Sequence, residues 1–238
     1  MKKHTKYLLL ISFLTLLFGC DLPLQDNYDF NPELNIVDPW KDSTAWEFFN
    51  SPLAQRTGDE GQFLGDNYNY LVAAIEKAGF VELYNQTSNA NRTYLMLNNN
   101  AFTGGGDVIE IITGSWDEDL VESETPEETM ARVDTPEKME KLRTVLRYHI
   151  VDAYVDQIPT LRETFTQYIF QTLVPGEAGL IAFLRDDRYR TEINDDRRAP
   201  LPFPSSATSQ RERIRNSNYI FINGIGHSLN DPVRNLPY

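Results

Sequence analysis

Apolar and polar positions recur with two periodicities along this chain. The first half has mainly the periodicity of helices, and much of the second half has that of strands. Residues 66–78 carry apolar side chains three and four positions apart, and Gly79 follows where a helix commonly ends in the left-handed conformation. A shorter helix is predicted from Thr44, because Thr44 and Glu47 have the spacing of a capping box. The side chains predicted on one face of that helix are Trp46, Phe49, Asn50 and Leu53.

The clearest helical pattern follows Thr135 and Pro136. A threonine can cap the first turn with its hydroxyl, and proline suits the first helical position because the backbone N–H is unpaired there. Apolar residues then recur at the spacing of one helix face. The predicted members of that face are Leu142, Val145, Leu146, His149 and Ile150.

Strand-like apolar runs occur before and after this helix. The predicted strands are 93–97, 165–173, 180–185, 189–193, 218–222 and 225–229. Asn223-Gly224 separates the last two and predicts a type I′ hairpin turn, in which both central residues take positive φ. Because helices come first and an antiparallel sheet follows, the predicted class is α+β.

The first twenty residues have the parts of an export signal. Lysines precede an uncharged apolar run that ends at Phe18 and is too short to span a bilayer. Leu17, Gly19 and Cys20 resemble a bacterial lipobox, although Phe18 is bulkier than usual. We expect residues 1–19 to be removed and Cys20 to carry lipid, which anchors the protein in the cell envelope, at the outer membrane. The alternative is an ordinary signal with an incidental cysteine.

The composition limits which partners the protein can bind and indicates how the chain is divided into a tether and a domain. Cys20 is the only cysteine, so the exported domain has neither an internal disulfide nor a cysteine-based metal site. The net charge of −13 repels phosphate backbones and argues against nucleic acid as a partner. Residues 20–42 carry three prolines and little periodicity and are predicted to be a tether. Residues 43–238 are predicted to form one domain.

Four sequence blocks, taken in order, resemble those of the fasciclin (FAS1) family. They are Leu71–Gly79, similar to an AIEKAGL helix; Thr93–Phe102, similar to TLFAPTDEAF; Leu142–Val151, ending in Tyr-His-Ile-Val; and Asn223–His227, similar to NGVIH. The resemblance implies an antiparallel sheet wedge flanked by several helices. It also implies adhesion or ligand binding rather than catalysis, which is an analogy from fold to function.

The chain also departs from the family pattern. Leu97, Asn98 and Asn99 replace the usual proline, threonine and acid, and Leu229-Asn230 is displaced by one residue from the usual Ile-Asp. Two stretches, about 103–137 and about 185–215, look like inserted loops that carry this protein's own specificity. Lipoproteins with one such domain are typical of Bacteroidota-like bacteria, often near starch-utilisation-type importers.

Two histidines, His149 and His227, remain after the signal. One interpretation is a two-histidine metal or acid–base site, and the other is a pair of buried side chains that satisfy polar backbone groups. No His-x-x-x-His or His-Glu pair supports zinc, so no metal site is predicted. The resemblance implies a structural role for Tyr148, His149, Asn223, Gly224 and His227.

Residues 107–128 hold nine acids and no lysine or arginine. Asp117-Glu118-Asp119 offers oxygen ligands to calcium, but the spacing does not match an EF-hand loop. The alternative is a solvated acidic loop. Trp116, in the same segment, is a candidate for stacking on a sugar or anchoring a protein partner, or for plugging the loop onto the core. Trp46 is assigned to the core from its helical spacing.

Residues 185–215 carry eight arginines against six acids, with three prolines between them. Paired guanidinium hydrogen bonds from this segment suit a carboxylate or an acidic glycan. The candidate residues are Arg197, Arg198, Arg211 and Arg213, together with Arg215. The alternative is that these arginines pair with nearby acids, namely Asp186, Asp187, Asp195 and Asp196.

Signatures of common enzymes are missing from the sequence. It contains no Gly-x-Ser-x-Gly elbow, phosphate loop or dinucleotide fingerprint, and no cofactor is predicted. We expect a lipid-anchored, non-catalytic adhesion module that binds an envelope protein or glycan. Two other interpretations stay open. One is an accessory lipoprotein of a starch-utilisation-type outer-membrane importer that captures glycan or peptide, and the other is a glycan hydrolase with a carboxylate pair.

Overall fold

A computed structural model describes residues 40–52, 54–55, 67–104, 107–115, 124–195 and 212–233. Residues Asp38–Tyr238 form one compact unit. The predicted export signal, Cys20 and nearly all of the predicted tether lie outside the described residues, and their assignments stay predictions. None of the described helices is both long and apolar enough to cross a bilayer.

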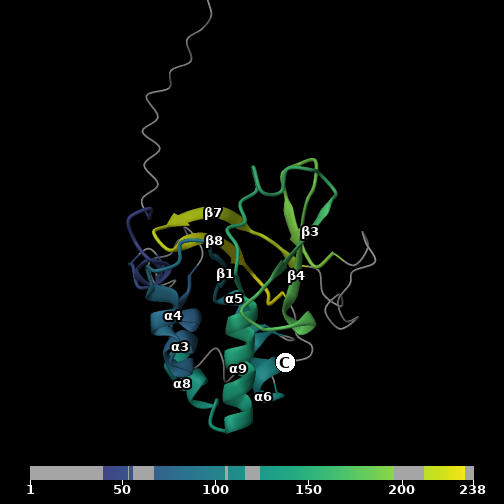
Figure 1. Cartoon of the computed structure of the whole chain (residues 1–238). Helices are drawn as coiled ribbons and strands as arrows, with labels where there is room; N and C mark the ends of the chain where they lie inside the picture. The colour runs from purple at the N-terminus through teal and green to yellow at the C-terminus, as the bar shows by residue number, and fades with distance from the viewer. Residues whose placement is uncertain are drawn as a thin grey trace, which may run out of the picture. The chain divides into compact units, whose positions relative to one another are not determined.

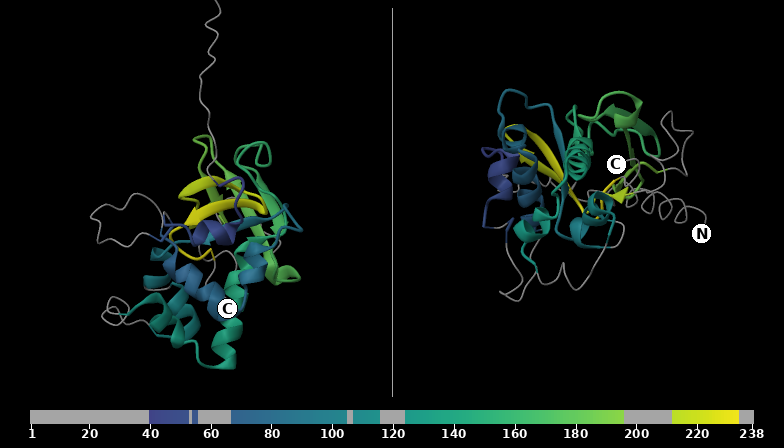
Figure 2. Two further views of the ribbon diagram at one scale, coloured as in Figure 1. Left: turned by 90° about the vertical axis from the view of Figure 1, so that its left-hand side faces the viewer. Right: turned by 90° about the horizontal axis from the view of Figure 1, so that it is seen from below.

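The described helices pack mainly against one another. They are α2 (Ala45–Phe49), α3 (Asn69–Ala78), α4 (Val81–Asn85), α5 (Asn100–Thr103), α6 (Val108–Thr113), α8 (Pro126–Ala131) and α9 (Pro136–Tyr148), with a 3-10 turn at Glu177–Gly179. Helix α9 contacts both α3 and α6, and α8 contacts α3. In Figure 1 these four helices gather below the sheets, and Figure 2 shows the same layering from the side.

Eight described strands form two four-stranded sheets. They are β1 (Thr93–Leu97), β2 (Ile150–Val151), β3 (Gln167–Gln171), β4 (Leu180–Arg185), β5 (Thr191–Ile193), β6 (Glu212–Arg213), β7 (Asn216–Phe221) and β8 (Gly224–Leu229). Sheet A has the order β2-β1-β8-β7 and sheet B the order β3-β4-β5-β6. All pairs are antiparallel except β1 and β8, which run parallel with Leu95 opposite His227. The predicted α+β class is confirmed, with one parallel pair inside the expected antiparallel arrangement.

Two predicted helix starts and one predicted helix end are confirmed, while α3 begins at Asn69 rather than near residue 66. Thr44 and Glu47 form the capping box of α2, and Thr135 accepts a hydrogen bond from Lys138 N at the start of α9. Gly79 ends α3 in the left-handed conformation, with φ 71°. Local capping chemistry depends on residues three positions apart, so it can be predicted from sequence without knowledge of the packing.

Two details of the predicted helices are wrong. In α2 the buried face is formed by Ala45, Phe48 and Phe49, while Asn50 is exposed and Trp46 is partly buried and packs against the core. The reason is that Phe48 packs among aromatic rings from other elements, including Phe221 at 5.4 Å between ring centroids. Ile150 does not continue α9. It belongs to β2, because the chain turns there to pair with β1.

The predicted type I′ turn is also wrong. Phe221 pairs with Gly224, so the two loop residues are Ile222 and Asn223, and neither has positive φ. Asn223 instead uses its side chain inside the protein, where Oδ1 accepts from Ala45 N at 3.0 Å and Nδ2 donates to Tyr84 O at 2.7 Å. Gly224 is required because a Cβ there would collide with the Arg92 carbonyl oxygen.

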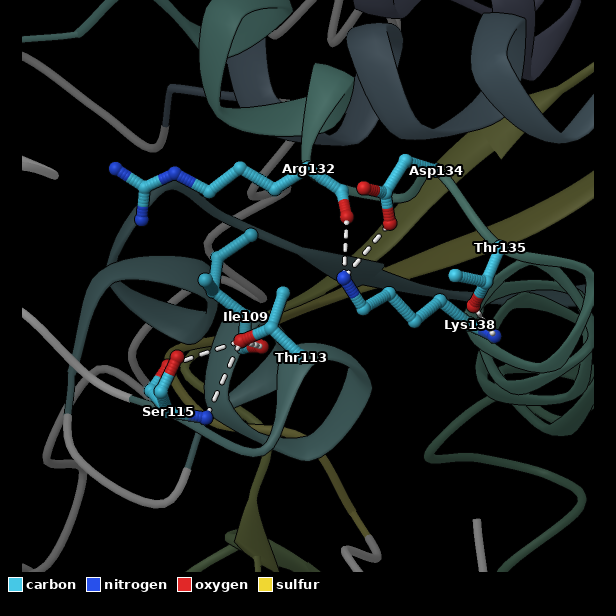
Figure 3. Close-up of polar contacts among 7 residues, drawn as sticks. All are labelled: Ile109, Thr113, Ser115, Arg132, Asp134, Thr135 and Lys138. Atoms are coloured by element: carbon cyan, nitrogen blue, oxygen red, sulfur yellow. Dashed lines mark hydrogen bonds and ion pairs between the residues drawn. The ribbon is translucent and has the colours of Figure 1, made fainter.

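The described residues of the first predicted insertion, 103–104, 107–115 and 124–137, belong to the folded domain and are largely helical. Helices α6 and α8, with the residues just after α8, contribute buried side chains to the core, namely Val108, Ile109, Ile112, Met130 and Val133. The Thr113 hydroxyl donates to Ile109 O at 2.7 Å at the end of α6, and Lys138 Nζ donates to Arg132 O at 3.0 Å between α8 and α9 (Figure 3). The second predicted insertion contains β5 and β6, and its residues 196–211 lie outside the described residues.

Candidate functional site

Helix α9 ends in two residues that join it to both sheets. The Tyr148 hydroxyl donates to Leu180 O at 2.9 Å and accepts from Asn194 Nδ2 at 3.0 Å, both in or beside sheet B. The next residue, His149, contacts sheet A through its main-chain oxygen, which accepts from Leu95 N of β1 at 2.8 Å. Its ring Nδ1 is 2.8 Å from Val145 O in α9 itself, and its Nε2 accepts from Val233 N, beyond β8, at 3.0 Å. Adjacent residues therefore fix the helix end to two different sheets.

His227 and Asn223 make comparable connections from the β7–β8 hairpin. The His227 ring Nε2 lies 2.7 Å from Val155 O, and its Nδ1 accepts from Asn218 N at 3.2 Å. All four side chains are fully or almost fully buried. We call Tyr148, His149, Asn223 and His227 the histidine hub. Each of them makes hydrogen bonds to main-chain groups, which is the second of the two interpretations considered for the histidines.

The environment of the hub keeps both histidines neutral. Burial lowers the pKa of His149 and of His227 to about 4, and hydrogen bonds to carbonyl oxygens oppose this only in part. In each ring one nitrogen donates and the other accepts, so neither offers an open lone pair to a substrate or metal. The geometry is that of a structural connection rather than of an acid–base pair.

The predicted ligand-binding residues are only partly within the described structure. Trp116, Arg197, Arg198 and Arg211 lie outside the described residues, as does the calcium candidate Asp117-Glu118-Asp119. Arg213, on β6, donates to the Glu192 carboxylate of β5 at 3.1 Å, with the carboxylate almost fully buried. Within the described ranges, no three His, Cys, Asp or Glu side chains are grouped as metal ligands.

Part of the acidic segment is buried rather than solvated. Asp107, at the start of α6, is 6% exposed, and burial followed by repulsion from Asp231 raises its pKa to about 7. Burial is also the main cause that raises the pKa of Glu212 on β6 to about 7, with Asp231 and Asp107 contributing repulsion. The three carboxyl groups come from distant parts of the chain, so sequence spacing did not reveal that they meet.

Exposed apolar side chains gather where a loop meets the β4–β5 hairpin. Tyr189 is 58% exposed, Ile158 57% and Phe165 41%. Gln157 Nε2 donates to Tyr189 O at 2.7 Å, and Phe165 N donates to Arg185 O at 2.8 Å, so loop and hairpin are joined directly. We call Ile158, Phe165 and Tyr189 the Tyr189 surface.

A buried arginine supports the Tyr189 surface from below. Arg185 is 7% exposed, and its Nε donates to Leu161 O at 2.8 Å while its NH2 group donates to Arg162 O at 2.7 Å. Its guanidinium carbon lies 5.0 Å from the centre of the Tyr189 ring. Carbonyl oxygens and the aromatic face thus compensate a buried charge that otherwise carries a large desolvation cost.

The backbone of this surface is held in an uncommon conformation. Phe165 and Tyr189 have φ of 59° and 62°, in the left-handed region that bulky residues rarely adopt. Backbone strain of this kind costs on the order of 1 kcal/mol per residue and persists where the surrounding structure imposes it. Two exposed aromatic residues held this way form the described feature that most resembles a binding surface.

Sequence reasoning missed the Tyr189 surface because Phe165 and Tyr189 read as the first residues of strands. A usable signal was present in Asp186, whose Oδ1 accepts from Arg188 N and Arg190 N, both at 2.8 Å. Aspartate commonly bonds to the backbone two residues on and so initiates a turn. That pattern predicts a tight hairpin whose tip carries Tyr189.

Comparisons with known proteins do not establish a family for this chain. Among solved structures, the chain is similar to a FAS1 domain pair from the insect cell adhesion molecule fasciclin I, with 11% sequence identity and a TM-score of 0.45. The match covers 71% of this chain and 47% of that chain, so this chain spans about half the length of the domain pair. No protein-family model matches the chain, and neither does any curated protein.

Proposed function

We propose that this protein is a lipid-anchored, non-catalytic binding module of the bacterial cell envelope that contacts its partner through the Tyr189 surface. The observation that carries the proposal is the pair of exposed aromatic residues, Phe165 and Tyr189, held at positive φ above the buried Arg185. Large aromatic residues that are both exposed and held at positive φ are uncommon, because glycine or asparagine adopts this conformation at lower cost.

The composition of the Tyr189 surface suits a protein or glycan partner. Tyrosine and phenylalanine present large areas with few rotatable bonds, and aromatic residues are enriched at the centres of interfaces. The rings also offer flat faces on which sugars stack. Because the Arg185 hydrogen bonds fix the loop, less conformational entropy is lost when a partner binds.

The lipid anchor rests on the sequence before the domain. The lysine-rich start, the apolar run and Leu17 to Cys20 support processing at Cys20 and attachment through lipid. Such an anchor keeps a binding module at the membrane without a spanning helix, provided that more than one acyl chain is attached. A Cys20→Ala variant is expected to leave the membrane fraction, and radiolabelled palmitate is expected to enter only the wild-type protein.

Photo-crosslinking in the native cells tests the binding role. Tyr189 is replaced by p-benzoylphenylalanine, and irradiation is expected to give a discrete covalent adduct with an envelope protein or glycan. The matched control carries the same probe at Ile222, which is 47% exposed on the hairpin of sheet A. Equal adducts at both positions, or none at either, would contradict a specific contact through the Tyr189 surface.

A further inference from the structure

A pocket of about 610 Å³ lies beside α4 and the C-terminal end of α9 and shares no residue with the Tyr189 surface. Its walls come from the α3–α4 junction, from the segment before β1, from Arg147 of α9 and from Leu173 after β3. The volume falls in the range of about 300 to 1,000 Å³ that is usual for small-ligand pockets. The pocket therefore has room for one or two sugar-sized groups.

Arg147 presents one cationic side of the pocket. Its guanidinium carbon lies 5.1 Å from the centre of the Phe80 ring, which holds the planar group in place. The only acid paired with it within the described structure is Glu140, at 3.4 Å, and both side chains are more than one-third exposed. A loose surface pair of this kind contributes little, so a carboxylate can compete for the guanidinium.

Arg92 presents the second cationic side. One terminal nitrogen donates to Leu83 O at 3.1 Å, whereas the buried Nε makes no hydrogen bond within the described structure. The positive charge also lies near the hydroxyls of Tyr84 and Tyr94, where it opposes the rise in pKa that burial causes. Leu83 O thus holds the guanidinium at the pocket wall, where its charge attracts an anion.

The remaining walls favour a monoanion that also has hydroxyl groups and a flat, less polar face. Phe80, Leu83 and Leu173 supply apolar area. The Ser88 hydroxyl, which donates to Gln86 Oε1 at 3.1 Å, keeps lone pairs to accept, and Glu82 adds carboxylate acceptors for hydroxyl groups. Inorganic phosphate lacks the hydroxyl-bearing ring and the flat face that these walls would contact, so a sugar acid fits better than free phosphate.

We propose that this pocket binds a uronic acid residue of an acidic glycan, with its carboxylate between Arg92 and Arg147. The planar guanidinium fork matches the two oxygens of a carboxylate, which makes such pairs both strong and directional. In a protein of net charge −13, binding a negatively charged sugar requires a local cationic site of this kind.

Calorimetric titration of the full-length protein in detergent tests this assignment. The probes are trigalacturonate, a glucuronate-containing trisaccharide, the neutral galactotriose and inorganic phosphate. At least one uronate is expected to bind saturably, and galactotriose and phosphate at least tenfold more weakly. Arg92→Gln and Arg147→Gln are each expected to weaken uronate binding at least tenfold, and Arg92→Lys, which keeps the charge but not the fork, by less than Arg92→Gln.

The matched control is Arg162→Gln, which removes an arginine that is 83% exposed and outside the pocket and should leave uronate binding unchanged. Unfolding midpoints of all variants check that the domain remains folded. Absence of binding by both uronates, tighter binding of phosphate, or unchanged uronate binding in both pocket variants would overturn the proposal. These results are independent of crosslinking at Tyr189, so failure of the pocket and failure of the contact surface can be told apart.

Discussion

The histidine hub and the Tyr189 surface both depart from the usual placement of side chains. The hub places polar groups inside the protein, and the Tyr189 surface places apolar groups outside. The hub buries polar side chains, and its tyrosine, histidines and asparagine bond to main-chain groups of other segments. The Tyr189 surface exposes aromatic rings and buries a charge beneath them. The buried polar groups of the hub are explained by the elements that they connect. The exposed aromatic side chains on a strained backbone are explained by contact with a partner.

The largest effect is expected from Asn223→Ala, which removes the side chain that joins the β7–β8 hairpin to α2 and α4. Two buried main-chain groups, Ala45 N and Tyr84 O, lose their partners. The free energy of unfolding should fall by about 3 kcal/mol. Urea unfolding measures this, with Asn91→Ala at an exposed position as the control, for which a change below about 0.5 kcal/mol is expected.

Lowering the pH distinguishes the histidine hub from the Tyr189 surface, because only the hub contains neutral buried histidines. Their folded pKa of about 4 lies below the unfolded value of 6.5, so they contribute stability above pH 6.5 that is lost as the pH falls toward 4. His227→Gln should be less stable than the wild type at pH 7. Its deficit should shrink by about 2 kcal/mol at pH 4.5, because the variant lacks this titration.

Asp107→Asn provides a control of opposite sign for the acid experiment. The folded pKa of Asp107, about 7, lies above the unfolded value of 3.8, so this carboxyl group adds stability as the pH falls from 7 toward 4. Any advantage of the asparagine variant at pH 8 should therefore decrease on acidification. If the stability of Asp107→Asn and of His227→Gln, each relative to the wild type, changed in the same direction with pH, at least one of the two assigned charge states would be wrong.

Arg185→Met tests the support of the Tyr189 surface. The change keeps apolar volume but removes the hydrogen bonds to Leu161 O and Arg162 O. We expect a loss of about 1 to 2 kcal/mol in the free energy of unfolding and faster proteolytic cleavage between residues 157 and 165. Arg188→Met, at an exposed position of the same hairpin, should change neither quantity.

Much of the fold follows from local sequence, and most of the candidate site does not. The capping box at Thr44, the cap at Thr135 and the left-handed Gly79 depend on neighbours within a few residues, and each is confirmed. The hairpin turn was misassigned because Asn223 is held by Tyr84 and Ala45, both more than a hundred residues away. Local turn preference was overridden by these long-range contacts.

Neither of the two proposed binding regions could be predicted from the sequence, and the reason is the same for both. Arg92 and Arg147 meet only because α9 returns the chain to the segment before β1, and no motif spacing joins them. Phe165 and Tyr189 fit a strand pattern, since positive φ is not visible in a run of apolar letters. The arginine-rich segment carried the sequence prediction instead. Of its two described candidates, Arg213 pairs with Glu192 and Arg215 donates to Asn230 Oδ1.

The smallest change in stability is expected from Tyr189→Gly. Glycine relieves the cost of positive φ but loses the contact between the ring and Arg185, so the free energy of unfolding should stay within about 1 kcal/mol of the wild type. This outcome is unlike that of a core aromatic residue, whose truncation typically costs about 3 to 5 kcal/mol. A loss of that size would show that the ring serves the fold.

Binding of the Phe165→Gly/Tyr189→Gly double variant to isolated envelope fractions, measured beside its urea unfolding, tests the central claim most directly. The account predicts that saturable binding falls at least tenfold while the free energy of unfolding changes by no more than about 2 kcal/mol. Binding equal to that of the wild type, from a variant that is equally well folded, would contradict the claim that the Tyr189 surface is kept for contact with a partner.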